Sequence, residues 1–297
     1  GLVEQTFRHS YIASLLKIPH VIVCVNKMDL VGYKEEVYDN IVEEYKAFSS
    51  KLEVSDVQFV PISALAGDNV VNRSDNTPWY QGATLMHMLE SVHIESDYNH
   101  IDSRFPVQYV VRPHSKEHHD FRGYAGRIAG GIFRPGDDII VLPSGFSSKI
   151  KRITSGEEEL EEAFAPMSVT MTLHDEIDIS RGDIIAKPNN FPQSEQDLDL
   201  MLCWMNQRPV NLNSKFFVRH TTREVRGVLK EIQYKLDINS LTRLENIDQL
   251  GMNDIARVKI RTAQPLCFDP YRKNRITGSL ILIDEGTNET VAAGMIV

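Results

Sequence analysis

The sequence predicts an α/β segment followed by two small all-β domains, and two observations carry this prediction. In the first hundred residues, the apolar runs 21–25 and 59–62 flank an amphipathic helical pattern at 34–48, which gives a strand–helix–strand unit. After about residue 100, short alternating segments follow one another and are separated by glycine-containing turns. Such close spacing of turns is typical of small antiparallel barrels.

The α/β segment begins with a predicted helix in which Phe7, Tyr11 and Leu15 recur at a spacing of four and which Pro19 ends. The run 21–25 is rich in β-branched residues and lacks polar alternation, so we expect a parallel strand that is covered on both faces. The loops after the two strands of this segment would then lie at the carboxyl edge of the sheet. Ligands of open α/β sheets bind at that edge.

The all-β part is predicted to form two separate domains. A polar segment at 188–198, PNNFPQSEQDL, favours a linker between them, and a second all-β block runs from residue 200 to the end. We therefore expect an α/β domain at 1–100, a first barrel at 101–190 and a second barrel at 191–297.

Composition excludes several classes of protein. Hydrophobic residues make up 42% and charged residues 25% of the chain, which is ordinary for a globular protein, and no apolar run approaches the ~18 residues of a membrane helix. The net charge of −9 disfavours nucleic acid as a partner. Cys24, Cys203 and Cys267 form no CxxC pair and lie in apolar surroundings, so we expect buried thiols in a reducing cytoplasm, without disulfide or metal roles.

The tetrapeptide Asn26-Lys27-Met28-Asp29 follows the first predicted strand and has the chemistry of a guanine-binding loop. Guanine presents a ring N–H and an exocyclic amine on one edge, and the carboxylate of Asp29 can accept from both. Asn26 can join the base edge to a neighbouring loop, and the alkyl stem of Lys27 can lie along the flat face of the base. Because such a loop is also good turn chemistry, the motif needs a structural context.

A second loop supplies that context. Ser63-Ala64-Leu65 follows the second predicted strand, so its backbone N–H groups should face the guanine carbonyl oxygen from the adjacent strand end. The predicted guanine-binding residues are therefore Asn26, Lys27, Asp29, Ser63, Ala64 and Leu65.

Residues 1–31, including Gln5-Thr6 and His9, are similar to the second half of the GTP-binding (G) domain in translational GTPases of the elongation factor Tu class. In that class a P-loop G domain precedes two β-barrels, domains II and III, so the resemblance covers the whole chain. The later motifs resemble one branch, the GTPase subunits of bacterial sulfate adenylyltransferases. These motifs are RFPVQYV at 104–110, FRGYAG at 121–126, DEIDISRGD at 175–183, DPYRKNRITGSLILID at 269–284 and TNETVAAGMI at 287–296.

The resemblance implies one subunit of a heteromeric cytoplasmic enzyme that makes adenosine 5′-phosphosulfate from ATP and sulfate. GTP hydrolysis on this subunit, with GTP and GDP as its nucleotides, would drive the uphill step, while a separate PP-loop catalytic subunit transfers the adenylyl group. Two alternatives remain: a translation factor that binds tRNA and the ribosome, or a non-catalytic module that docks on the adenylyltransferase through its barrels.

The phosphate side of a GTPase site has no counterpart in this sequence. A P-loop needs G-x-x-x-x-G-K-[ST], and no Gly-Lys pair occurs in the chain. Asp120-Phe121-Arg122-Gly123 matches a D-x-x-G pattern but follows the guanine loop, so we interpret it as a barrel turn. We therefore expect the P-loop, the D-x-x-G loop and the Mg²⁺ site to precede Gly1. Residues 1–297 alone would then hold no catalytic residue and no metal, would be inactive, and would expose one face of the first strand.

Three further features have competing interpretations. His114, His118, His119 and Asp120 form a candidate metal cluster, although an exposed polar loop explains the same residues. Trp79-Tyr80 is either an interface anchor or a packing pair. In Arg181-Gly182-Asp183, we expect Gly182 to permit a tight turn.

Overall fold

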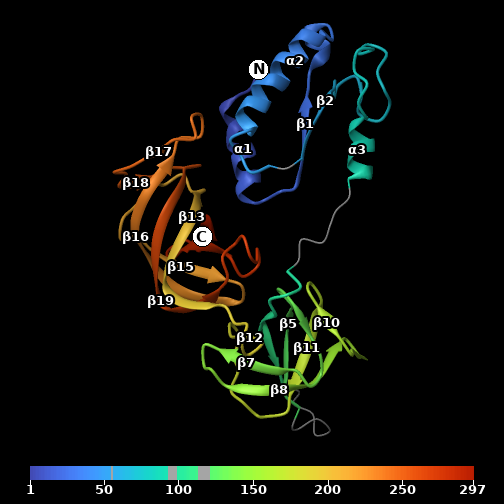
Figure 1. The fold of residues 1–297 in the computed structure, drawn as a ribbon. Coiled ribbons are helices and arrows are strands. Elements are labelled where there is room, and N and C mark those ends of the chain that lie inside the picture. The colour runs from blue at the N-terminus through green and yellow to red at the C-terminus, as the bar shows by residue number, and fades with distance from the viewer. Residues whose placement is uncertain (55, 93–98, 113–120) are drawn as a thin grey trace. The chain divides into compact units, whose positions relative to one another are not determined.

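The computed structural model describes residues 1–54, 56–92, 99–112 and 121–297 (Figure 1). The chain divides into two compact units, Gly1–Ser96 with Asp237–Thr242, and Asp97–Leu236 with Arg243–Val297. The predicted fold class, an α/β segment followed by two antiparallel barrels, is confirmed. The candidate metal cluster at 114–120 lies outside the described residues.

The first unit is a two-stranded parallel sheet with helices packed on it. Its strands β1 (His20–Val25) and β2 (Asp56–Pro61) pair from His20 opposite Asp56 to Val25 opposite Pro61. Its helices are α1 (Glu4–Leu15), the 3₁₀ helix η1 (Met28–Val31), α2 (Glu35–Ser49) and α3 (Leu85–Ser91).

The sequence of α2 explains how this unit packs. Acidic residues occupy its first turn, where they complement the positive end of the helix dipole, and Val42, Tyr45 and Phe48 form its buried stripe. The Tyr45 ring lies 5.6 Å from the Phe59 ring of β2, and the Phe48 ring lies 4.6 Å from a phenylalanine of α1. α2 therefore packs against both α1 and β2.

The other face of the sheet packs against α3. Val60, which alternates with Phe59 along β2, forms a small core with Ile62 and with Met88 of α3. The expected complete covering of β1 is wrong, because only Val25 of this strand is buried and Cys24 is exposed. Among the described residues β1 pairs with β2 alone, so its other edge and part of its faces meet solvent. The expected burial of the thiols holds for Cys267 but not for Cys24.

The first barrel consists of an eight-stranded antiparallel sheet and a small two-stranded sheet. Its strands are β3 (Arg104–Pro106), β4 (Tyr109–Val111), β5 (Gly123–Arg127), β6 (Ile132–Phe133), β7 (Asp138–Leu142), β8 (Ser147–Ser155), β9 (Glu158–Glu159), β10 (Ala163–Phe164), β11 (Ser168–Leu173) and β12 (Ile184–Ala186).

The large sheet runs in the order β3-β12-β7-β8-β11-β5-β4, with β9 beside β8, and curves around one apolar core. The chain from β3 to β4 closes it, because Arg104 and Gln108 donate backbone hydrogen bonds to Gly130 and Ala125 beside and within β5. Gly182, just before β12, has φ +96°, a conformation that side chains rarely adopt, which confirms the predicted tight turn. Gly123, the last residue of the D-x-x-G match, begins β5.

The second barrel is built from longer strands. They are β13 (Gln193–Trp204), β14 (Val210–Asn211), β15 (Lys215–His220), β16 (Arg223–Leu236), β17 (Arg243–Leu244), β18 (Gln249–Leu250), β19 (Ile255–Phe268), β20 (Ser279–Asp284) and β21 (Thr290–Ile296).

Six of these strands close completely, in the order β15-β20-β21-β13-β19-β16 with β16 returning to β15. In the middle of β19 the side chains alternate, with Ala256, Val258 and Ile260 in the core and Arg257, Lys259 and Arg261 outside it, as expected for a strand with one face toward the barrel interior. The polar linker predicted at 188–198 is wrong over its second half, because β13 begins at Gln193. Gln193, Ser194 and Glu195 pair with the end of β19, so the strand ladder rather than an apolar pattern holds them in place.

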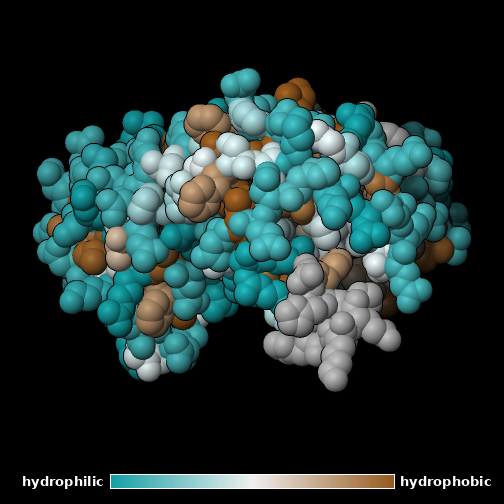
Figure 2. Space-filling model, turned by 90° about the horizontal axis from the view of Figure 1, so that it is seen from below, coloured by the Kyte–Doolittle hydropathy of each residue, from teal (hydrophilic) through white to brown (hydrophobic). Residues whose placement is uncertain are grey.

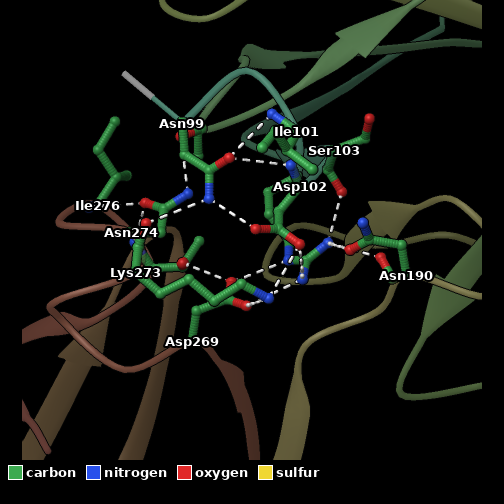
Figure 3. Close-up of polar contacts among 12 residues, drawn as sticks. Asn99, Ile101, Asp102, Ser103, Asn190, Asp269, Lys273, Asn274 and Ile276 are labelled. Atoms are coloured by element: carbon green, nitrogen blue, oxygen red, sulfur yellow. Dashed lines mark hydrogen bonds and ion pairs between the residues drawn. The ribbon is translucent and has the colours of Figure 1, made fainter. Parts of the chain in front are cut away.

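A buried ionic network joins the two barrels within the second unit (Figure 3). Arg104 of β3 and Asp269, just after β19, form two hydrogen bonds of 2.8 and 2.9 Å. Lys273 lies 2.9 Å from Asp102, whose carboxylate also accepts from Asn99 at 2.6 Å. Two cations thus balance two carboxylates at this junction, which fits the rule that buried charges are paired.

The surface gives a separate observation. Figure 2 shows one face covered mostly by hydrophilic residues, with hydrophobic ones scattered singly or in small groups, which is normal for a folded domain. In the part of the chain that the structure describes, no helix combines the length and the apolar character needed to cross a membrane.

Candidate functional site

The two predicted loops meet through one side chain, that of Asn26. Directly after β1, the Asn26 Oδ1 accepts the backbone N–H of Lys27 at 2.7 Å and that of Ala64 at 3.0 Å. Backbone hydrogen bonds hold the same two segments together, since the Ile62 N–H donates to Val25 O and the Met28 N–H donates to Ile62 O. The loop after β1 is therefore fixed to the loop after β2 at the carboxyl edge of the sheet.

The first loop turns sharply and presents polar groups. Lys27 has φ +65° and Gly32 has φ +61°, so left-handed residues flank η1 on both sides. The side chains of Asn26 and Lys27 are exposed, and Asp29 is half-buried. None of the hydrogen bonds within the described residues uses the Asp29 carboxylate, so its acceptor positions remain available to a ligand.

The second loop has one free donor. Ser63 is fully buried, and its hydroxyl accepts the N–H of Ala66 at 3.2 Å, so its side chain stabilises the turn. The N–H of Ser63 donates to Asp68 O, and that of Ala64 is used by Asn26. Among the described residues, the Leu65 N–H has no acceptor. Among the described residues, this loop therefore offers a ligand one backbone N–H group, that of Leu65, whereas the sequence predicts three.

A third segment, which the sequence did not indicate as part of the site, connects both loops; we call residues 68–80 the strap. The Asp68 carboxylate accepts from Tyr33 Oη at 2.6 Å, from Ser74 Oγ at 2.5 Å and from Asn76 Nδ2 at 3.3 Å. The hydrogen bonds from Ser74 and Tyr33 hold the pKa of Asp68 below its usual value, and the bond to Asp68 raises the pKa of Tyr33.

Asn69 attaches the strap to the sheet. Its side chain is 1% exposed, donates to Pro61 O at 2.9 Å and to Thr77 Oγ1 at 2.8 Å, and accepts the N–H of Ser74 at 2.9 Å. In the sequence, Gly67-Asp68-Asn69 indicates a turn at the start of the strap, but it does not indicate which residues hydrogen-bond to Asp68 and Asn69.

Trp79 and Tyr80 are packing residues. Trp79 Nε1 donates to Tyr33 O at 3.0 Å, and its ring lies 5.2 Å from that of Tyr38 on α2. Tyr80 Oη donates to Phe59 O and Ala83 O, and both side chains are half-buried. Their polar atoms are used inside the unit, so packing rather than an exposed anchor explains the pair.

A metal centre is a separate question. Within the ranges that the structure describes, no three or more His, Cys, Asp or Glu side chains gather in a way that could hold a metal ion.

Two family models match this chain. Residues 1–96 match the elongation factor Tu GTP binding domain, and residues 197–297 match the GTP-eEF1A C-terminal domain-like family. The first match contains both loops of the candidate site and the strap.

Curated relatives match along the whole chain. It is 48% identical to sulfate adenylyltransferase subunit 1 of Bacteroides thetaiotaomicron, a match that includes 100% of this chain and 62% of that protein. It is 49% identical to the bifunctional enzyme CysN/CysC of Mycobacterium tuberculosis, over 100% of this chain and 48% of that protein. The chain thus spans about half to three-fifths of the length of these relatives.

A solved structure supports the fold. The crystal structure of Sup35 complexed with GMPPNP resembles this one with a TM-score of 0.61 and 21% sequence identity, over 99% of this chain and 72% of that one. At this identity the likeness concerns the fold alone. The chain is thus similar over its whole length to proteins named sulfate adenylyltransferase subunit 1, and its first and last thirds match family models of translational GTPases.

Proposed function

We propose that this chain belongs to the GTP-binding and GTP-hydrolysing subunit of a cytoplasmic sulfate adenylyltransferase. The subunit couples GTP hydrolysis to the synthesis of adenosine 5′-phosphosulfate from ATP and sulfate. We assign residues 1–100 to the G domain, and 101–190 and 191–297 to the two barrels. The relatives named sulfate adenylyltransferase subunit 1, at 48 to 49% identity, support this function.

The observation that carries the nucleotide part of this proposal is the contact between Asn26 and Ala64. Through the 3.0 Å hydrogen bond from the Ala64 N–H, the Asn26 side chain holds two loops together at the carboxyl edge of a parallel sheet. Ligands of open α/β sheets bind at such an edge. The half-buried carboxylate of Asp29 and the free N–H of Leu65 belong to these same loops.

This arrangement offers what a guanine base needs. Asp29 would accept from the ring N–H and the exocyclic amine, and the Leu65 N–H would donate to the guanine carbonyl oxygen. The stem of Lys27 would lie on one face of the base, while Asn26, Ser63 and Ala64 keep the loops in place. Hydrogen bonds to a charged group contribute about 1.5–3 kcal/mol each. Adenine would leave Asp29 unpaired, so the site would discriminate strongly between the two bases.

We assign no residue of 1–297 to the phosphates or to Mg²⁺. A P-loop GTPase holds the phosphates with the backbone and lysine of its P-loop, and it holds the metal ion with the hydroxyl group of the P-loop serine or threonine. The Gly-Lys pair of a P-loop does not occur in this sequence. The acidic side chain available here, Asp29, belongs to the base edge of the site. Its chemistry fits base recognition rather than phosphate transfer.

The partner that we propose is the PP-loop catalytic subunit, which would bind ATP and sulfate. The relatives are named subunit 1 of sulfate adenylyltransferase, which supports the presence of at least one other subunit in their enzymes. The match of residues 1–96 to the elongation factor Tu GTP binding domain would also be compatible with a translation factor, but the net charge of −9 disfavours a nucleic acid partner.

The native complex tests the proposal. It should contain a second, ATP-binding subunit, and GTP should stimulate its synthesis of adenosine phosphosulfate from ATP and sulfate. A non-hydrolysable GTP analogue is the matched control and should not stimulate sustained synthesis. Tight binding of aminoacyl-tRNA, without any effect of GTP on sulfate activation, would favour the translation factor instead.

A further inference from the structure

A connected polar cluster of the first unit joins the two candidate guanine loops and includes Tyr33 and Asp68. Their side chains are hydrogen-bonded at 2.6 Å although the residues are 35 apart in sequence. Tyr33 follows Gly32, the residue that ends η1 after Asp29, and Asp68 pairs through its backbone with Ser63 of the second loop. The bond therefore links the two loops independently of Asn26.

Tyr33 is fixed at three atoms. Its N–H donates to Met28 O at 2.9 Å, its carbonyl accepts from Trp79 Nε1 at 3.0 Å, and its hydroxyl donates to Asp68. Its φ of +57° is unusual for a residue with a large side chain. A sparsely populated conformation of this kind persists when surrounding contacts over-determine it. Release of the hydroxyl would therefore favour relaxation of the turn that ends the Asp29 loop.

Asp68 is fixed equally well from the strap. Ser74 Oγ and Asn76 Nδ2 bind its Oδ1, which leaves its Oδ2 for Tyr33. Asn69, next in the chain, anchors the strap to Pro61 at the end of β2. The carboxylate is thus held by the strap and the sheet before it meets Tyr33, so it presents a rigid acceptor to the Asp29 loop.

We propose that Tyr33 and Asp68 form a clamp that sets how long a guanine nucleotide stays bound, by holding the Asp29 loop in its base-binding geometry. Both are positioning residues, since neither belongs to the groups that would contact the base. Opening of the clamp releases the Asp29 loop from its base-binding geometry and so allows the nucleotide to exchange. This inference rests on the proposed guanine site.

The chain offers a matched set of variants. Tyr33→Phe removes the hydroxyl group and keeps the ring. Asp68→Asn removes the negative charge of the carboxylate that accepts the hydrogen bond from this hydroxyl. Ser74→Ala is the control, because it removes a hydrogen bond to the same carboxylate without touching the Asp29 loop. The double variant Tyr33→Phe/Asp68→Asn measures the coupling between the two residues.

The first readout is amide hydrogen exchange in the chain without nucleotide. In Tyr33→Phe, exchange of the Lys27 and Ala64 amides, both bound to Asn26, should become about tenfold faster or more, as expected for the loss of a bond to a charged group. Ser74→Ala should accelerate exchange of these two amides much less, because Asn76 still binds the Asp68 carboxylate and the bond to Tyr33 stays in place. Equal acceleration by both variants would mean that the cluster only stabilises the unit, which would overturn the clamp.

The second readout is the dissociation of a fluorescent GDP from the native protein. Tyr33→Phe should accelerate dissociation about tenfold or more and change association little, and Asp68→Asn added to it should have almost no further effect. Asp29→Asn, measured in parallel, separates the two hypotheses. If Asp29→Asn shifts base preference while Tyr33→Phe leaves dissociation unchanged, the clamp is wrong and the guanine site stands; if Asp29→Asn has no effect on base preference, the proposed site itself fails.

Discussion

Arg104 and Asp269, which are 165 residues apart, form a bidentate ion pair in which the two residues are 0% and 2% exposed (Figure 3). Arg104 Nη1 also donates to Ser103 O and Asn190 O, and Thr277 Oγ1 donates to Asp269 Oδ2. One guanidinium thus contacts the first barrel, the segment between the barrels and the second barrel. This pair therefore joins the two barrels within their single compact unit.

Removal of one partner from this pair should be costly. Arg104→Met leaves the Asp269 carboxylate buried without its cation, and losses of about 3–5 kcal/mol in the free energy of unfolding are typical of such changes. Arg261→Ala is the matched control, because its pair with Asp197 is 54% and 63% exposed and should contribute less than about 1 kcal/mol. Urea denaturation of the three proteins checks this. Similar losses in the two variants would contradict a special role for the buried pair.

His220 should make stability depend on pH. The side chain is buried, its Nε2 lies 2.7 Å from Thr277 O, and burial lowers the pKa of its imidazole below the usual value of about 6.5. The unfolded chain therefore binds a proton at a pH where the folded chain does not. The contribution of His220 to the free energy of unfolding is therefore fully present above pH ~6.5. It decreases as the pH falls from there toward the lowered pKa of the folded state.

The measurement is the free energy of unfolding at pH 7.5 and at pH 5.5, in the wild type and in His220→Gln. The wild type should lose more stability between these two values than the variant, which cannot titrate. A variant with the same pH dependence as the wild type would show that carboxylates, rather than His220, dominate in this range.

Gly131 should tolerate no side chain. It has φ +69°, and a Cβ there would overlap the backbone of Ser103, directly before Arg104. Gly136 has φ +89° but faces open space, so it is the matched control for backbone strain without a clash. Gly136→Ala should cost about 1–3 kcal/mol, and Gly131→Ala clearly more, as thermal unfolding would show. Equal costs would mean that the backbone of Ser103 moves aside easily.

Much of the geometry of the candidate site was predictable because its signals are local. Asn26 to Asp29 form a short motif after an apolar strand, and a parallel partner strand must place Ser63 to Leu65 beside it. The Tyr33–Asp68 bond was not predictable, since tyrosine and aspartate in two polar loops have many alternative partners and only the tertiary structure selects one.

The same limit explains what sequence patterns missed in the fold. Arg104 is charged, and charged residues are usually exposed, so periodicity alone cannot reveal a fully buried arginine whose partner is 165 residues away. Gln193 to Glu195 are polar and belong to a strand because β19 offers them a ladder. Local composition cannot show either partner.

Asp29→Asn should change which purine the site prefers. The asparagine keeps one acceptor oxygen but replaces the other with an amine, which would face the exocyclic amine of guanine donor to donor. Xanthine carries an oxygen in place of that amine and would accept from the asparagine. Loss of one charge-assisted bond, about 1.5–3 kcal/mol, corresponds to roughly 10- to 150-fold weaker GTP binding, while binding of xanthosine triphosphate should improve. Competition between the two nucleotides in the native protein measures the ratio. Because Asp29 accepts no hydrogen bond within the described residues, the substitution should leave the fold intact, so a variant that keeps its GTP preference would show that another residue binds the base.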